Sequence, residues 1–380
     1  MSLFLLNEEH VMMQELTRSI VEKEIKPIAG EIDEEERFPQ ESIEKLAEAG
    51  ILACPFPEEL GGSGMDVLSF ALAVEEVAKA CGSTSSIIAT HGVSMYCVEQ
   101  FGTEEQKKKY MPLMAQGSLM GFALTEANAG SDASGMVTKA VQDGDSYVLN
   151  GAKMFISSAP SNAFHIVITV TGSDEKGRKE FTAFIVDKDA PGFSVGKHIP
   201  KMGIRGSLTA EIVFEDCRIS AEQMLGKRGD GMNVALASLD VGRIYMGSQA
   251  LGIAQGALNE TIKYVGERVQ FGKRIAQFQN TQFTLADLQT KVEAGRLLIW
   301  NAAARKDGGH SFAKEAAMAK LYNSDLAMQV TTECVQLFGG YGYSREYPIE
   351  RMMRDAKITQ IYEGTNQIQK MVIARAIGVK

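Results

Sequence analysis

A single acidic residue near the end of the chain is the first candidate for chemistry. Glu363 lies in the segment IYEGTNQIQ, between an aromatic residue and a glycine, with no second acid or histidine beside it. A glutamate near its reference pKa of about 4.3 is a weak base. Burial among apolar side chains raises the pKa of a carboxyl group and makes it a better general base. The structural alternative is an acid at a helix N-terminus, which the helix dipole stabilises.

A segment rich in small residues could lie against a flat ring. In FALTEANAGSDASG, at 122–135, small side chains allow the backbone to approach a ligand closely, and Thr125 and Ser131 offer hydroxyl groups. The alternative is an ordinary turn before a strand, because Gly, Ser and Asn are typical of turns. A second segment, MFISS at 154–158, has the local pattern of a strand that enters a turn.

Three further segments contain residues that a binding site could use, and each also has a structural explanation. Arg268 in ERVQFGKRIAQFQ is expected as a cation in the last turn of a helix before Gly272, where the dipole favours it. The glycines of QLFGG, at 336–340, are typical of a helix C-terminus. Asp240 and Arg243 in SLDVGR have the i, i+3 spacing of an ion pair within a helix, which contributes about a few tenths of a kcal/mol.

Several common active-site motifs are missing from the sequence. LGGSG and GGYGYS lack the spacing of the G-x-G-x-x-G dinucleotide motif, and neither a Walker lysine motif nor G-x-S-x-G is present. These absences disfavour a nicotinamide enzyme on a Rossmann fold and a serine hydrolase. The five histidines and five cysteines are scattered, with no C-x-x-C pair. We therefore expect no metal site, and cysteines that are reduced and mostly buried.

Charge and hydropathy disfavour nucleic acid and membrane as partners. The 380-residue chain has a net charge of −9, and its basic residues are spread along its length, whereas a nucleic-acid site requires a basic patch. No apolar run reaches the roughly 18 residues that a membrane span needs. The N-terminal segment MSLFLLNEEHVMMQEL has neither the basic region of a secretory signal nor the arginines of a transit peptide. We expect a cytoplasmic protein.

Three regions of different periodicity must position these segments. Residues 1–120 have the helical period, with Asn7 as a predicted N-cap and Gly50 as a predicted helix end. Residues 121–230 contain short runs with a period near two, which predicts an antiparallel sandwich or barrel. Residues 231–380 return to the helical period, in segments at roughly 231–266, 277–306, 311–338 and 348–376. The predicted fold is an α+β protein of three domains, with an N-terminal helical domain, a middle β domain and a C-terminal four-helix bundle.

Three segments in order give the chain a strong resemblance to the acyl-CoA dehydrogenase family. FALTEANAGSDASG and QLFGGYGYSREYPIERMMRD match the two signature patterns of that family, and IYEGTNQIQ follows them. The resemblance covers the whole chain and implies the same order of helices, sheet and helices. SLDVGRIYMGSQALGIAQGAL and FAKEAAMAKL are similar to the short-chain, butyryl-CoA branch of the family.

The resemblance implies that the cofactor is FAD and that two subunits share its site. Residues 122–131 would lie along the flavin, and 155–157 would lie against the isoalloxazine ring. Arg268 and Gln279 would reach the FAD of a neighbouring subunit, and 336–340 would lie against the ADP end of FAD. The residues that the resemblance assigns to the cofactor are Phe122, Ala123, Leu124, Thr125, Gly130, Ser131, Phe155, Ile156, Ser157, Arg268, Phe271, Gln279, Gln336, Leu337, Phe338, Gly339, Gly340, Thr365, Asn366 and Gln367.

The resemblance also implies a mechanism in which Glu363 is the catalytic base. Glu363 would remove the pro-R α-proton of the thioester while the β-hydrogen passes as hydride to flavin N5, which yields a trans-2-enoyl-CoA. Gly242 aligns with the position at which the isovaleryl-type and long-chain branches carry their glutamate, so this chain has no acid there. The residues that the resemblance assigns to the substrate are Ser131, Asp240, Arg243, Tyr362 and Gly364.

The implied partners are a short-chain acyl-CoA, an electron-transfer flavoprotein as electron acceptor, and three further copies of the chain in a dimer of dimers. A short branched-chain acyl-CoA is the alternative substrate. A flavin acyl-CoA oxidase, which passes electrons to oxygen, and a non-enzymatic helical interaction module are the alternative functions. A glutaryl-CoA type is disfavoured, because Thr84 aligns with the arginine of that branch.

Overall fold

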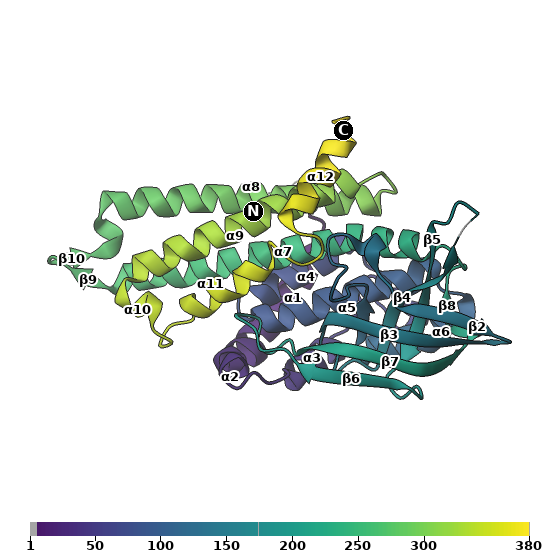
Figure 1. Cartoon of the computed structure of the whole chain (residues 1–380). Helices are drawn as coiled ribbons and strands as arrows, with labels where there is room; N and C mark the ends of the chain where they lie inside the picture. The colour runs from purple at the N-terminus through teal and green to yellow at the C-terminus, as the bar shows by residue number, and fades with distance from the viewer. Residues whose placement is uncertain (1–5, 174, 380) are drawn as a thin grey trace.

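The computed structural model describes residues 6–173 and 175–379. Helices lie at both ends of the chain and a β-sheet lies between them in sequence (Figure 1). The helices that precede the sheet are α1 (Glu8–Ile20), a π-helical turn (Val21–Ile25), α2 (Ala29–Glu34), α3 (Gln40–Glu48), α4 (Val67–Ala78), α5 (Gly82–Phe101) and α6 (Glu104–Ala115).

Side-chain caps fix the ends of the first helices. The Asn7 side chain accepts a hydrogen bond from the His10 backbone N–H at 2.8 Å, and the Asn7 N–H donates to His10 Nδ1 at 3.2 Å. Both hydrogen bonds satisfy groups that a helix N-terminus leaves without partners. Gly50 follows α3 with a φ of 71°, a left-handed conformation that glycine adopts at low cost. The predictions for Asn7 and Gly50 are confirmed.

The β region forms one eight-stranded sheet. Seven strands have the order β6-β7-β3-β2-β4-β5-β8, and β1 pairs with β4. The strands are β1 (Met120–Ala123), β2 (Lys139–Asp143), β3 (Ser146–Ser157), β4 (Phe164–Ser173), β5 (Lys179–Asp187), β6 (Phe193–His198), β7 (Thr209–Ser220) and β8 (Met224–Leu225). Five of the pairings are antiparallel as expected, whereas β4 runs parallel to both β1 and β2. The sequence could not show this, because the β2–β3 hairpin separates these partners along the chain.

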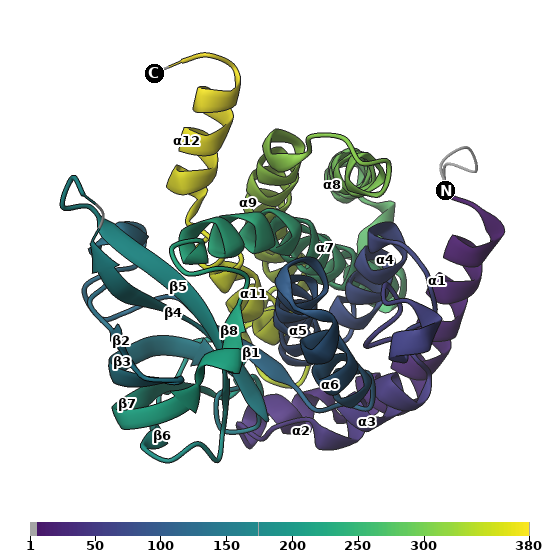
Figure 2. The same ribbon diagram turned by 90° about the vertical axis from the view of Figure 1, so that its right-hand side faces the viewer.

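In the described residues, the sheet is followed by three long helices, α7 (Gly231–Glu267), α8 (Gln279–Asp307) and α9 (Ala313–Phe338). Three shorter helices come after them: α10 (Gly340–Tyr343), α11 (Ile349–Ile358) and α12 (Asn366–Ala376). The prediction of one helix over 348–376 is wrong, because residues 359–365 separate α11 from α12. The chain turns there through Glu363 and Gly364, both of which have positive φ. Helix α12 projects from the body of the molecule (Figures 1 and 2).

Helix α7 runs through the centre of the molecule, with α4 and α5 on one side and α8 and α9 on the other (Figure 2). Its glycines allow this packing. A Cβ on Gly252 would lie 2.3 Å from the Glu75 carbonyl oxygen, and a Cβ on Gly256 would lie 2.2 Å from the Lys79 carbonyl oxygen. Larger residues at these positions would push α4 away from α7, so these glycines set the distance between the N-terminal and C-terminal helices.

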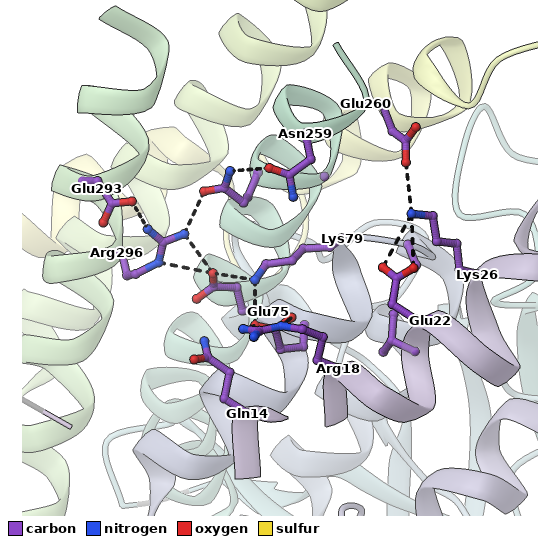
Figure 3. Close-up of a pocket in the computed structure, with 15 residues that line it drawn as sticks. Gln14, Arg18, Glu22, Lys26, Glu75, Lys79, Asn259, Glu260, Glu293 and Arg296 are labelled. Carbon is purple, nitrogen blue, oxygen red and sulfur yellow. Dashed lines mark hydrogen bonds and ion pairs between the residues drawn. The ribbon is translucent and has the colours of Figure 1, made fainter. Parts of the chain in front are cut away.

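A buried ion pair adds a second connection between the two helical regions, and neighbouring cations of the N-terminal helices extend it (Figure 3). Arg296 on α8 donates to Glu75 Oε1 on α4 from Nε at 3.2 Å and from Nη2 at 3.0 Å. Glu76, the next residue of α4, accepts a hydrogen bond from Arg18 on α1 at 2.9 Å and one from Lys79 at 2.7 Å. These groups surround a cavity of about 340 Å³. Their charges are paired, as buried charges must be.

Two kinds of feature, a membrane-spanning helix and a metal site, can be checked on the described part of the chain. None of its helices is long and apolar enough to cross a membrane. Within 6–173 and 175–379, no group of three or more His, Cys, Asp and Glu side chains is arranged to hold a metal ion. All five cysteines are buried and unbridged, as predicted.

Candidate active site

Glu363 lies in the turn between α11 and α12 in an unusual backbone conformation. Its φ is 53°, and that of Gly364 is 88°. A left-handed residue other than glycine costs about 1–2 kcal/mol, so the surrounding structure must stabilise it. The Gln369 side chain, one turn into α12, donates to the Glu363 carbonyl at 3.1 Å and to the Gly364 carbonyl at 2.8 Å. The Asn366 N–H closes the turn on the Gln360 carbonyl at 3.0 Å.

The Glu363 carboxyl group lies in buried surroundings that stabilise its protonated form. Its Oε2 is buried and has no hydrogen-bond partner among the described residues. Burial raises the pKa of Glu363 to about 7, and the nearby cations Arg243 and Lys320 act in the opposite direction. A carboxylate that is desolvated and titrates near neutral pH has the properties of a general base. The sequence-based prediction for Glu363 had required this kind of environment.

Helix α7 provides the surface opposite the Glu363 carboxylate. A Cβ on Gly242 would lie 3.0 Å from Glu363 Oε2 and 2.9 Å from Val93 Cγ2 on α5. Gly242 therefore leaves room for the carboxylate that no other residue would leave. The position identified from sequence as the alternative site for a catalytic acid thus lies directly beside Glu363.

Arg243 and Asp240 form the ion pair that their spacing predicts. The Arg243 Nη1 contacts Asp240 Oδ1, and Arg243 is only 4% exposed. The Nε of Arg243 is buried and has no partner within the described residues. This cation lies close enough to Glu363 to lower its pKa. Arg243 therefore belongs to the surroundings of the carboxylate as well as to the ion pair.

Tyr362, immediately before Glu363, is held in place by a chain of hydrogen bonds. Its hydroxyl donates to Gln249 Oε1, and the Gln249 side chain in turn donates to the Gly82 carbonyl at 3.0 Å. Gln249 is fully buried. This hydrogen-bonded chain connects the turn to α7 and α5. Gln249 could not be predicted from the sequence, because a single glutamine in a helix carries no signal of its environment.

The segment at 122–131 is attached to the sheet by a buried lysine. Lys153 on β3 is not exposed, and its ammonium donates to Glu126 Oε1 at 2.8 Å and to the Leu124 carbonyl at 3.0 Å. The Met154 N–H donates to the Thr125 carbonyl at 2.8 Å. These contacts bring 122–131 against 154–158, so the structure places the first two predicted flavin segments side by side.

The surface formed by these two segments is suited to a flat ligand. Phe155 has a φ of 60° and is 61% exposed, which is unusual for a large aromatic residue. Gly130 has open space where a Cβ would be, and Ser131 is exposed. The Ser158 hydroxyl is buried without a partner in the described chain. Ala123 and Ile156 are buried, with 0% and 2% of their surface exposed, so their side chains belong to the core beneath this surface.

The other predicted cofactor residues lie at the far end of the long helices. Arg268 follows the last residue of α7, and its guanidinium lies over the Tyr341 ring at 5.5 Å. It lines a cavity of about 530 Å³ together with residues 336–340. Phe271 is 93% exposed, with a φ of 52°, in the hairpin of β9 (Val269–Gln270) and β10 (Lys273–Arg274). Gln279 begins α8 beside this hairpin.

The two groups of cofactor residues are far apart within one chain. From Gly242, beside Glu363, to Arg268 the chain follows α7 for 26 residues, which corresponds to about 39 Å. Figure 1 shows β9 and β10 at one end of the helices and the sheet at the other. The structure therefore does not bring all the predicted cofactor residues into one site of one chain.

Thr365, Asn366 and Gln367 have three different environments. The Thr365 hydroxyl accepts from the Ile368 N–H and caps α12. Gln367 is exposed. The Asn366 side chain is instead buried against α9, where its Oδ1 accepts from Lys320 at 2.9 Å and its Nδ2 donates to Asp325 at 2.8 Å. Asn366 thus stabilises the turn with its side chain and with its backbone N–H, and with 6% of its surface exposed it presents little to a ligand.

Comparison with known proteins identifies the family of the chain. Models of three acyl-CoA dehydrogenase domains match it: the N-terminal domain at 7–118, the middle domain at 121–217 and the C-terminal domain at 229–378. The chain is 46% identical to "Acyl-CoA dehydrogenase, short-chain specific" of Clostridium acetobutylicum, over 98% of this chain and 99% of that protein.

Two solved structures are also very similar. Butyryl-CoA dehydrogenase from Megasphaera elsdenii is 45% identical with a TM-score of 0.96, over 98% of this chain and 99% of that one. A chain solved in work on the electron transferring flavoprotein of Acidaminococcus fermentans and flavin-based electron bifurcation is 45% identical with a TM-score of 0.96, over 99% of this chain and 100% of that one. The protein therefore belongs to the acyl-CoA dehydrogenase family.

Proposed function

We propose that the protein oxidises the Cα–Cβ bond of a short-chain acyl-CoA to give the trans-2-enoyl-CoA, with Glu363 as the base. The observation that carries this proposal is the desolvated Glu363 carboxylate, whose Oε2 lacks a partner and whose pKa is raised to about 7. The α-hydrogen of a thioester is a very weak acid. Its removal requires a positioned base and stabilisation of the enolate charge at the same time.

Two groups of the turn serve these needs. The ionised Glu363 carboxylate takes the α-proton, and Gly242 leaves it free to approach the α-carbon. The Glu363 N–H donates no hydrogen bond within the described residues, so it is available to the thioester carbonyl oxygen. A backbone N–H directed at a developing oxyanion is a strong source of transition-state stabilisation. Proton removal and charge stabilisation thus come from one residue.

The residues near the turn fit FAD, the cofactor of this family. When bound, FAD supplies the acceptor for the β-hydrogen as hydride. The 122–131 and 154–158 segments offer an exposed aromatic ring at Phe155, open space at Gly130 and a hydroxyl without a partner at Ser158. Arg268 provides a guanidinium for the pyrophosphate, and Gly339 and Gly340 leave open space for the ADP end.

The cofactor site is completed by a second copy of the chain. The distance of about 39 Å along α7 places Arg268, Phe271 and the 336–340 segment beyond the reach of an FAD bound near Glu363 in the same chain. A two-fold arrangement of two chains supplies each site with both groups. Exposed apolar side chains at Phe271, Phe283 and Ile377 are consistent with burial by other copies. Two such dimers form the expected tetramer.

The substrate, acceptor, location and domain boundaries follow from the resemblance and from the relatives. The identity with the short-chain enzyme of C. acetobutylicum supports butyryl-CoA, with Ser131, Asp240, Arg243, Tyr362 and Gly364 at the substrate. Similarity to the chain studied with the A. fermentans flavoprotein supports an electron-transfer flavoprotein as acceptor. Domains at 1–120, 121–230 and 231–380 and a cytoplasmic location remain predictions.

A panel of thioesters tests the proposal. The FAD-loaded protein is mixed without oxygen with butyryl-CoA, hexanoyl-CoA or isobutyryl-CoA, and the loss of flavin absorbance is followed together with the product. Butyryl-CoA should reduce the flavin fastest and yield crotonyl-CoA. A preference for isobutyryl-CoA would support the branched-chain alternative, and rapid peroxide formation in air would support the oxidase. Failure of all three thioesters to reduce the flavin would contradict the proposal.

A further inference from the structure

A buried lysine lies directly behind the Glu363 turn. Lys320, on α9, has no exposed surface, although lysine is among the residues most rarely buried. Its ammonium donates to the Gly364 carbonyl at 2.8 Å and to Asn366 Oδ1 at 2.9 Å. Both acceptors are neutral, and the carboxylates Glu363 and Asp325 act on the ammonium only through their charge. A buried cation with two neutral acceptors is costly, so its presence requires an explanation.

The acceptors of Lys320 belong to the turn that carries Glu363. Gly364 follows Glu363 directly, and its carbonyl receives two donors, Lys320 and Gln369. The Asn366 side chain is held in turn by Ser324, which donates to its Oδ1 at 3.1 Å, and by Asp325, which accepts from its Nδ2 at 2.8 Å. Helix α9 therefore holds the turn through Lys320 and through Asn366.

The conformation of the turn explains why it needs this support. Glu363 and Gly364 are consecutive residues with φ of 53° and 88°. An unsupported glutamate would relax to a negative φ, and this rotation would carry its side chain away from Gly242. The orientation of the carboxylate is thus set by whatever fixes the carbonyls on either side of it.

We propose that Lys320 is a positioning residue: by holding the Gly364 carbonyl and the Asn366 side chain, it fixes the left-handed turn that aims the Glu363 carboxylate at the substrate. This inference rests on the proposed role of Glu363. Lys320 does not touch the substrate in this scheme and acts through the turn alone. It connects α9 directly to the Gly364 carbonyl, which follows the base in the chain.

The charge of Lys320 adds a second effect. The cations near Glu363 are Arg243 from α7 and Lys320 from α9, and both favour its ionised form. The charged groups near Lys320 are Glu363, Arg243 and Asp325, and burial lowers the pKa of Lys320 to about 7. Removal of the ammonium should therefore raise the pKa of Glu363. Because the base acts when ionised, the rising limb of the pH profile should move to higher pH.

The test is flavin reduction by butyryl-CoA in FAD-loaded Lys320→Met, measured from pH 5.5 to 9. Met has a similar length without the charge. At pH 7 the rate constant at saturating substrate should fall on the order of 10- to 100-fold, as for a misaligned catalytic group. The half-saturating concentration should change little, and the rising limb should shift upward. Lys314→Met, at a lysine of the same helix whose side chain is 41% exposed, is the matched control and should match the wild type.

Asn366→Ala provides a second variant that keeps the buried ammonium. It removes one of the two acceptors and should lower the rate constant in the same direction by a smaller factor. A wild-type rate and pH profile in Lys320→Met would overturn the inference. The inference would also be overturned if the rate constant fell only in proportion to the flavin content and the rising limb of the pH profile did not move. That result would indicate a purely structural role for Lys320. Glu363→Gln separates the two proposals: if it keeps the wild-type rate, the role of Glu363 itself is wrong.

Discussion

The Glu363 carboxylate lies so close to the α-carbon of Gly242 that a methyl group added at position 242 would press against it. A Cβ at position 242 would lie 3.0 Å from Glu363 Oε2. Glu363 is near the C-terminus and Gly242 lies in the first third of α7, so the fold brings together residues that are 121 positions apart. The space that the carboxylate occupies therefore depends on the absence of a side chain at position 242.

Gly242→Ala should reduce activity while the protein stays folded. The new Cβ would meet both Glu363 Oε2 at 3.0 Å and Val93 Cγ2 at 2.9 Å, so the carboxylate must move from its present place. We expect flavin reduction by butyryl-CoA to slow on the order of 10- to 100-fold. Gly266→Ala is the control, because it lies on the same helix with nothing near its Cβ. Equal activities of the two variants would show that the Gly242 contact does not matter.

The rate of flavin reduction should rise with pH through the pKa of Glu363. Burial raises this pKa from its ordinary value to about 7, so the base is protonated and inactive below that pH. A plot of the rate constant against pH from 5.5 to 9 should bend near 7. A flat profile down to pH 5.5 would mean that the active base ionises at a lower pH.

The same shift predicts a pH-dependent difference in stability. Between about pH 4.5 and 7 the folded protein holds a proton on Glu363 that the unfolded chain has lost, so this group reduces stability as pH rises through that window. Glu363→Gln removes the effect. Denaturant unfolding should therefore show the variant gaining stability over the wild type from pH 5 to pH 7.5, with no further gain above. A constant difference across this range would contradict the raised pKa.

Mixed oligomers test whether two chains share the cofactor site. Arg268→Ala should lose FAD and Glu363→Gln should lack the base, so each variant alone is expected to be inactive. In a co-expressed hybrid, one of the two sites would combine both defects and the other would be intact. Random pairing should then restore about a quarter of the wild-type activity. No recovery in hybrids verified by mass spectrometry would place both residues in one chain's site.

Lys153→Met should loosen the 122–131 segment. The change leaves the Glu126 carboxylate without its buried cation and the Leu124 carbonyl without its donor. Removal of one partner of a buried ion pair typically costs about 3–5 kcal/mol. We expect a loss of this size in the free energy of unfolding, together with weaker FAD retention. Lys139→Met, at an exposed position of β2, should change neither quantity. An unchanged free energy of unfolding in Lys153→Met would show that this ion pair does not stabilise the protein.

Periodicity was enough to predict the order of helices, sheet and helices, because it reports which face of an element is buried. The helix ends at Asn7 and Gly50 were also predictable, because residue type alone favours asparagine at a helix N-terminus and glycine after a helix C-terminus. The division of the predicted helix at 348–376 into α11 and α12 was not predictable, because Glu363 adopts a positive φ that its residue type disfavours. The turn depends on donors from Lys320 and Gln369, which only the tertiary structure brings together.

The buried lysines were the main omission from the predicted site. Lys153 and Lys320 have the same local pattern as the many solvated lysines of the chain, and neither stands in a motif that marks burial. Their positions become meaningful only when their acceptors, at Leu124 and Gly364, are known. Residue type and resemblance suggested Glu363, whereas the groups that hold it required the fold.

The role of Glu363 as the base is tested by comparing wild-type protein with Glu363→Gln in the same anaerobic experiment. Both proteins are loaded with FAD and mixed with excess butyryl-CoA, and the visible spectrum is followed. The wild type should bleach, whereas the variant should bind the thioester, seen as a perturbed flavin spectrum, and bleach at least about 1000-fold more slowly. Bleaching of the variant at a rate similar to the wild type would show that Glu363 is not the base.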